Sequence, residues 1–195
     1  MRRSTFCLTL ASAFGVRSVW AANLPRPAKE LKIDLVNGRS MLLSTLRGRV
    51  IALQFILTTC PHCQQACQMM ERMYKKYGAK GLFPLAVAIN PLALAAVPKF
   101  VQDFQITYPV GACSNETAME WLQHPMMIRM MMPQIAFIDR QMTVISQYSG
   151  DSQFFGANSE ENAAKEIEAL LGAGAGKAPA KGGAPKSAKT AGKKT

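Results

Sequence analysis

The sequence predicts a single α/β domain in which a central mixed β-sheet is flanked by helices. Two apolar runs of strand length, residues 50–57 and 82–89, lack the polar alternation of a half-exposed strand, which is typical of strands buried on both faces. Each run is followed by a segment with apolar residues at helical spacing, residues 61–77 and 92–104. This order of strands and helices, without an internal repeat, indicates one α/β domain and no second one.

An N-terminal β-hairpin is expected before the first buried strand. Residues 31–36 form one strand and residues 39–43 return, with Asn37 and Gly38 as a two-residue turn because both residues tolerate positive φ. Residues 46–49 then turn the chain into the buried strand.

The first long helix is expected from Pro61 to Tyr77. Proline is tolerated in the first helical turn, where its missing N–H costs little, and Gly78 ends the helix. An apolar stripe at helical spacing faces the core and consists of Cys63, Cys67, Met70, Tyr74 and Tyr77.

The remaining elements are an extended piece, a capped helix, a second hairpin and a terminal amphipathic helix. They are expected at residues 108–110, at 115–123 with Ser114 or Asn115 as the cap, at 134–138 paired with 143–148, and at 158–171 with Gly172 after it.

The charge of +11 is concentrated at the two ends of the 195-residue chain. Residues 1–17 hold three arginines and residues 172–195 hold six lysines, and neither segment has an acidic residue. The part between them has 14 basic and 12 acidic residues, so the body is nearly neutral. A nucleic-acid-binding fold would need its positive charge on that body, and we therefore exclude this class.

Residues 1–22 have the three parts of a secretory signal. Two arginines lie near the start, residues 6–16 are apolar but too short to span a membrane, and small residues follow. We expect cleavage after Ala21 or Ala22 and a periplasmic or secreted protein. The alternatives are an uncleaved membrane anchor or an unstructured start.

The domain itself is expected at residues 23–171, followed by a disordered tail at 172–195. The tail alternates Gly, Ala, Pro and Lys and cannot bury enough apolar area to offset the cost of ordering. We interpret it as a solvated extension. The alternative is weak contact of its lysines with an anionic envelope surface.

The sequence Cys60-Pro61-His62-Cys63 lies where the first buried strand leads into a helix. Two cysteines in a first helical turn can close a small disulfide, and the free N–H groups of the helix start favour a thiolate at the leading one. A CxxC pair in this strand-to-helix context indicates a redox dithiol.

A zinc site is the main alternative for this CxxC pair. It would need two more ligands, and only His124 and Cys113 remain, at a spacing that matches no common zinc pattern. We therefore expect no metal and no cofactor. Cys67 is interpreted as a buried core thiol, with a third redox thiol or a disulfide to Cys113 as the alternatives.

With these features the chain resembles the thioredoxin superfamily over residues 31–171. The hairpin, the Leu-Arg-Gly-Arg turn at 46–49 and the inserted short helix are most similar to the exported TlpA/ResA branch, and the tetrapeptide is the CPHC sequence of DsbA. The resemblance implies a thioredoxin-like fold and a cis proline beside the dithiol, here Met132-Pro133, whose preceding backbone pairs with substrate.

The resemblance also implies a thiol-disulfide oxidoreductase that acts on protein thiols and disulfides. Cys60 would attack or leave, His62 would stabilise its thiolate and Cys63 would resolve the mixed disulfide. Pro61, Met132 and Pro133 would contact the substrate. The expected redox partner is a membrane thiol-disulfide protein.

Three departures from the family pattern leave the redox direction open. Gln54 stands where thioredoxin has a buried Asp, Thr59 where the family usually has Trp, and Ala66 where the TlpA/ResA group often has Glu. Two carboxylates that handle protons are thus missing. A stabilised Cys60 thiolate favours an oxidant or isomerase over a reductant.

Three rival functions remain. A peroxidase of the related peroxiredoxin group would carry Thr and Pro where this chain has Leu57 and Leu53. Copper(I) delivery would use the soft sulfurs of the methionines around Pro133, although the exported copper chaperones of this fold use CxxxC and a later His. We favour a hydrophobic groove for peptide-like partners. The third rival is a binding module whose dithiol is idle. The methionines around Pro133 that would bind copper(I) or line the groove are Met126, Met127, Met130, Met131 and Met132.

Overall fold

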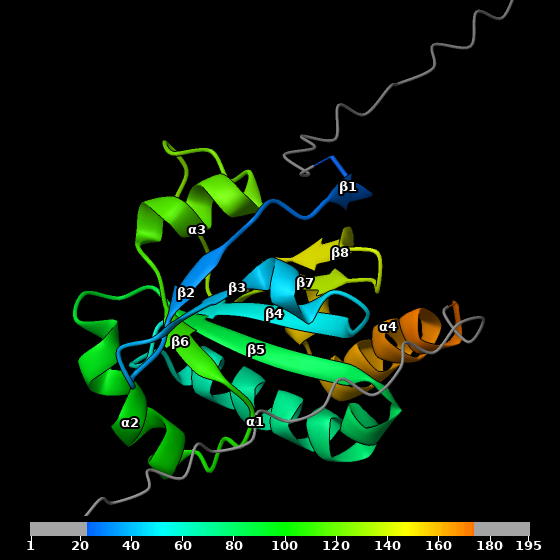
Figure 1. Cartoon of the computed structure of the whole chain (residues 1–195), viewed down its shortest axis with the longest axis horizontal. Helices are drawn as coiled ribbons and strands as arrows, with labels where there is room; N and C mark the ends of the chain where they lie inside the picture. The colour runs from blue at the N-terminus through cyan, green and yellow to red at the C-terminus, as the bar shows by residue number, and fades with distance from the viewer. Residues whose placement is uncertain (1–22, 174–195) are drawn as a thin grey trace, which may run out of the picture.

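The computed structural model describes residues 23–173 as a sheet of eight strands covered by helices on both faces (Figure 1). The strand order is β1-β8-β7-β4-β5-β6-β2-β3. The signal expected at 1–22 and nearly all of the expected tail lie outside the described residues. The predicted fold class, a mixed sheet flanked by helices with an N-terminal hairpin, is confirmed.

The strands are β1 (Arg26–Pro27), β2 (Lys32–Asp34), β3 (Ser40–Leu42), β4 (Val50–Ile56), β5 (Leu82–Ala88), β6 (Val110–Ala112), β7 (Gln134–Ile138) and β8 (Thr143–Tyr148). The α-helices are α1 (Pro61–Tyr77), α2 (Ala93–Asp103), α3 (Asn115–Leu122) and α4 (Ser159–Ala173). Three short 3-10 turns complete the fold: η1 (Leu43–Leu46), η2 (Gly78–Lys80) and η3 (Gln153–Phe155).

Strand β4 is the centre of the sheet and is buried along its whole length. It pairs in parallel with β5, from Val50 opposite Leu82 to Ile56 opposite Ala88, and antiparallel with β7. Alternate β4 side chains enter two separate apolar clusters. Helices α1, α2 and α4 cover one cluster, and α3 with η1 covers the other (Figure 1). This confirms the strand buried on both faces that the unbroken apolar run predicts.

The N-terminal hairpin forms, but the expected two-residue turn is wrong. The Leu35 N–H donates to the Arg39 carbonyl at 2.8 Å, and among the turn residues only Gly38 has a positive φ, of 75°. The Asn37 side chain accepts the Arg39 N–H at 3.1 Å. An Asx-type hydrogen bond of this kind stabilises a longer turn without a positive φ at asparagine.

Strand β1 has no counterpart in the sequence prediction, because a two-residue edge strand leaves no periodic pattern. Arg26 holds it in place: its guanidinium donates to the Trp121 carbonyl at 2.8 Å and lies 4.8 Å from the centre of the Trp121 ring. The Trp121 indole N–H in turn donates to the Lys29 carbonyl at 2.9 Å. The N-terminal segment is thereby fixed to α3.

Two elements differ in extent from the expectation. The extended piece expected at 108–110 continues as strand β6 from Val110 to Ala112, and the Tyr108 side chain before it is buried in the core. Helix α4 continues through Gly172 to Ala173, the last residue described. No helix within residues 23–173 is long and apolar enough to cross a membrane.

Gly150 packs against the Met132–Pro133 peptide group, and replacing it by alanine tests this contact. Gly172, which has open space around it, serves as the control. A methyl group at Gly150 would overlap the Met132 carbonyl group, whereas one at Gly172 meets nothing within 4 Å. We expect Gly150→Ala to lower the free energy of unfolding by about 1–3 kcal/mol through overpacking. Gly172→Ala should raise it by about 0.5–1 kcal/mol, because alanine loses less backbone entropy in a helix. Urea unfolding of both variants measures the difference, and equal effects would contradict the packing described here.

Candidate active site

The CPHC sequence lies at the junction of β4 and α1, as predicted. Cys60 is the N-cap of α1, with an extended backbone, and Pro61 is the first helical residue. The Cys60 sulfur accepts the backbone N–H of Cys63 at 3.4 Å. One unpaired donor of the helix start is therefore directed at this sulfur, where it stabilises negative charge.

The two thiols differ in accessibility. Cys63 is fully buried, and its sulfur accepts the Leu57 N–H at 3.5 Å. Burial raises the pKa of the Cys63 thiol, because the thiolate would lose its hydration. Cys60 is only partly buried and His62 is exposed. The pair therefore consists of one outer and one inner sulfur.

The loop between β4 and Cys60 is anchored on two sides. The Thr58 N–H donates to the Asn90 side-chain oxygen at 3.0 Å, and the Gln64 amide donates to the Thr58 carbonyl at 3.1 Å. These bonds connect the loop to the segment after β5 and to the first turns of α1. The position of Cys60 is therefore fixed by both neighbours of the loop.

The Met132–Pro133 peptide bond is cis, as the resemblance implies. Pro133 directly precedes β7, whose first residue, Gln134, pairs with Phe55 near the end of β4. Pro133 and His62 line one small cavity of about 160 Å³. The fold thus brings the predicted residues of the tetrapeptide and the Met132–Pro133 pair to one edge of the sheet.

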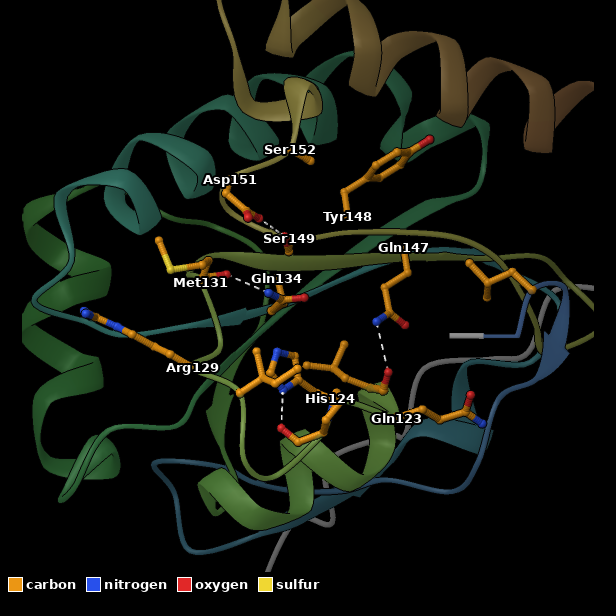
Figure 2. A pocket seen from close by; sticks show the side chains of 14 residues that line it. Gln123, His124, Arg129, Met131, Gln134, Gln147, Tyr148, Ser149, Asp151 and Ser152 are labelled. Carbon is orange, nitrogen blue, oxygen red and sulfur yellow. Dashed lines mark hydrogen bonds between the residues drawn. The ribbon is translucent and has the colours of Figure 1, made fainter. Parts of the chain in front are cut away.

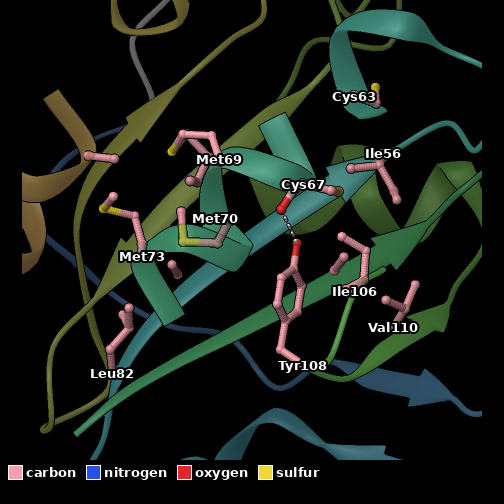
Figure 3. Close-up of a cluster of buried hydrophobic side chains, with 14 of the residues drawn as sticks. Ile56, Cys63, Cys67, Met69, Met70, Met73, Leu82, Ile106, Tyr108 and Val110 are labelled. Atoms are coloured by element: carbon pink, nitrogen blue, oxygen red, sulfur yellow. Dashed lines mark hydrogen bonds between the residues drawn. The ribbon is translucent and has the colours of Figure 1, made fainter. Parts of the chain in front are cut away.

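A buried polar network between β4 and α1 was missed by the sequence prediction. The Gln54 amide donates to the Ala66 carbonyl at 3.3 Å, and the Tyr108 hydroxyl is within 3.0 Å of the Gln54 side-chain oxygen. The same hydroxyl lies 3.3 Å from the Cys67 carbonyl (Figure 3). The network joins β4 to α1 through neutral groups only. A tyrosine 54 residues from its partner leaves no local sequence signal.

Glu71 fixes the segment that carries Tyr108. This carboxylate is buried and accepts both the N–H and the hydroxyl of Thr107, each at 2.8 Å. Lys75 lies 3.6 Å away on the exposed side. Because a buried carboxylate needs such partners, Glu71 is explained as a clamp between α1 and residues 107–108.

The disulfide between Cys67 and Cys113, one of the alternatives from the sequence, does not form. Both residues are free thiols, and they pack against the two opposite faces of the sheet. Burial raises the pKa of each thiol to about 12. His124 directs its Nδ1 atom at the Pro125 carbonyl, 3.0 Å away. Within residues 23–173, no three His, Cys, Asp or Glu side chains gather as a metal site.

A larger cavity of about 410 Å³ lies on the other side of the Met132–Pro133 segment (Figure 2). Its floor includes Gln134, whose amide donates to the Met131 carbonyl at 2.6 Å, and its wall includes Gln147, which donates to the Leu122 carbonyl at 3.0 Å. These two hydrogen bonds hold the backbone at Met131 and at Leu122, on either side of the cavity.

These features define a thioredoxin-like α/β fold. It is similar to the crystal structure of a putative thiol:disulfide interchange protein DsbE from Chlorobium tepidum, with a TM-score of 0.65 and 24% identity over 75% of this chain and 96% of that one. A secreted Mycobacterium tuberculosis disulfide oxidoreductase is similar over 72% of this chain and 96% of its own, with a TM-score of 0.58 and 14% identity. At these identities the likeness concerns the fold.

The chain belongs to the AhpC/TSA family, whose model matches residues 24–147. Among curated proteins it is similar to the thiol-disulfide oxidoreductase ResA of Halalkalibacterium halodurans, with 32% identity over 78 residues, 40% of this chain and 44% of that protein. ResA of Bacillus subtilis is 28% identical over 83 residues, 43% of this chain and 46% of that protein. The chain spans less than half of these relatives, and the expected resemblance to ResA is confirmed.

The positions that would distinguish a peroxidase are apolar. Leu53 is fully buried in the cluster below α3, and Leu57 packs against the same cluster. Neither side chain can donate a hydrogen bond to a peroxide. The residues at the dithiol therefore favour disulfide exchange over peroxide reduction within this family.

We expect alkylation by iodoacetamide to distinguish the two partly buried thiols, Cys60 and Cys113. With a pKa of about 12, roughly one Cys113 side chain in ten thousand is a thiolate at pH 8. Cys60 should therefore react first, and the Cys113 rate should rise about tenfold per pH unit from pH 8 to 11. Mass spectrometry of the labelled peptides measures both rates. Faster labelling of Cys113 than of Cys60 at pH 8 would contradict the prediction.

Replacing Tyr108 by phenylalanine tests the buried network. The Gln54 oxygen would lose its hydroxyl partner in the core, so we expect the free energy of unfolding to fall by about 1–3 kcal/mol. Tyr74→Phe is the matched control, since no hydrogen bond of the Tyr74 hydroxyl occurs within the described part of the chain and its ring packs edge-on against Tyr108. A loss of equal size in the control would show that the hydroxyl of Tyr108 has no special role.

Proposed function

We propose that this protein is a thiol-disulfide oxidoreductase that exchanges disulfides with protein thiols through Cys60 and Cys63. The observation that carries the proposal is the pairing of an accessible sulfur, capped by the N–H of the helix start, with a buried sulfur one turn further along α1. Pro133 lies at the same edge of the sheet, where the backbone before it can pair with an extended substrate.

The exchange balances as a two-electron reaction. When the oxidised enzyme acts, a substrate thiolate attacks the Cys60 sulfur, the bond to Cys63 breaks, and Cys63 leaves as a thiolate that takes up a proton. A second substrate thiolate then attacks the substrate sulfur of the mixed disulfide. This step forms the substrate disulfide and releases the Cys60 thiolate, beside the N–H of Cys63 and the exposed His62.

The hydrogen bond to the Cys60 sulfur favours the direction in which this chain gives its disulfide to other proteins. The N–H of Cys63 donates to this sulfur at 3.4 Å, and a donor at the helix start stabilises the Cys60 thiolate. A stabilised thiolate favours the reduced enzyme, so the oxidised enzyme gives up its disulfide. Burial raises the pKa of the Cys63 thiol, which slows its departure and its attack alike and does not set the direction.

The proposed setting is outside the cytoplasmic membrane, with residues 1–22 as a signal or an anchor. Its partners would be protein thiols and a membrane thiol-disulfide protein that restores the active form. The lysine-rich tail at 172–195 would add at most a weak contact with an anionic envelope surface.

The reduction potential of the Cys60–Cys63 pair tests the function and its direction. Equilibration with glutathione buffers should give one two-electron couple near −120 mV, about the value of strongly oxidising enzymes. The variants Cys60→Ser and Cys63→Ser should each abolish it, whereas Cys67→Ala should retain it.

A reduction potential of about −270 mV would contradict the proposed direction, but it would still support disulfide exchange. No couple, or one that persists in Cys60→Ser, would overturn the function itself. A second readout is the capture of a reduced, unfolded test protein as a mixed disulfide. Oxidised wild-type protein should oxidise it. Cys63→Ser, first converted to the mixed disulfide of Cys60 with glutathione, should exchange glutathione for the test protein and retain it through Cys60.

A further inference from the structure

Three methionines from two segments of the chain surround one pocket on the α3 side of the sheet. Met119 lies in α3, and Met130 and Met132 lie in the segment that leads to Pro133. The pocket has a volume of about 280 Å³. Its other lining residues are Leu57, Ile89, Asn115, Ile128 and Arg129.

The sulfur of Met119 is fixed at the wall of this pocket. The Asn115 side-chain amide donates to it at 3.5 Å, and Met119 is 6% exposed. Met130 and Met132 are half-buried and pack against the apolar cluster below α3. Methionines that only filled a core would leave no open volume between them, whereas these three line a space that a solute can enter.

The lining has the chemistry of a soft-metal site. Thioether sulfur binds Cu(I) and Ag(I), while hard or divalent cations need carboxylate, imidazole or thiolate ligands. No Asp, Glu, His or Cys is among the residues that line this pocket, and its one charged group is Arg129. A cationic neighbour opposes a divalent ion more strongly than a monovalent one.

We propose that Met119, Met130 and Met132 form a thioether site for a soft monovalent cation, Cu(I) by preference. The step is coordination alone, with no change of oxidation state. Two further methionines on the same segment, Met126 and Met127, are 67% and 97% exposed, and they give an incoming ion sulfur ligands at the surface.

The site is separate from the dithiol, although the two are neighbours. Leu57 lines the pocket and its N–H bonds the Cys63 sulfur, and Met132 precedes Pro133. Because a dithiol itself binds Cu(I) strongly, the test must remove it. The full chain with Cys7, Cys60, Cys63 and Cys113 changed to serine keeps the methionines and lacks the redox pair.

We expect this four-serine variant to take one equivalent of Cu(I) from the copper–bicinchoninate complex, with ascorbate present to keep the copper reduced. Met119→Leu combined with Met130→Leu should weaken binding at least tenfold, because leucine keeps the volume and removes the sulfur. The matched control combines Met70→Leu with Met73→Leu, two buried methionines of α1 on the other face. It should bind as the four-serine variant does.

Methionine methyl resonances give a readout that packing alone does not move. Silver(I) should shift the ε-methyl signals of Met119, Met130 and Met132 in methyl-labelled protein, and Zn²⁺ should not. Arg129→Gln should tighten Cu(I) binding, because a repulsive charge is removed. Equal binding by the Met119/Met130 variant and its control, or silver shifts confined to Met126 and Met127, would overturn the proposed site.

Discussion

The central position of β4 determines where everything else in the site can lie. This strand is hydrogen-bonded to β5 in parallel and to β7 in antiparallel register, and all seven of its residues are buried. Because β7 runs in the opposite direction, the residue before it, Pro133, comes to the edge at which β4 delivers Cys60. The backbone pairing of β4 with β5 and β7 therefore brings the loop that carries Cys60 close to the cis-proline segment, and the bonds of Asn90 and Gln64 to Thr58 then fix the loop.

Helix α1 gives the two thiols opposite surroundings. Its start directs an N–H at Cys60, and its inner face buries Cys63. Further along the same face, the Gln54 amide and the Tyr108 hydroxyl bond the carbonyls of Ala66 and Cys67 and fix the helix to the sheet. The helix that presents Cys60 to solvent therefore also buries Cys63, and this burial raises the pKa of the inner thiol.

The sulfur-rich character of this chain extends beyond its cysteines. The segment between α3 and β7 contains five of the twelve methionines. Flexible thioethers can pack against a peptide-like partner or bind a soft cation. The pocket beside α3 adds a defined volume and a fixed Met119 sulfur, which are the features of a site and not of a general apolar surface.

The sequence by itself determined the elements that have strong local signals. The unbroken apolar run of β4, Pro61 at the start of α1 and Gly78 at its end were sufficient for the order of these elements and for the CPHC junction. Only the tertiary structure decided the pairing of Gln54 with Tyr108, the clamp of Glu71 on Thr107 and the attachment of β1 through Arg26. It also decided the separation of Cys67 from Cys113 and the pocket between Met119 and Met130. These contacts join residues far apart in the chain, and their energies depend on burial, which no local pattern contains.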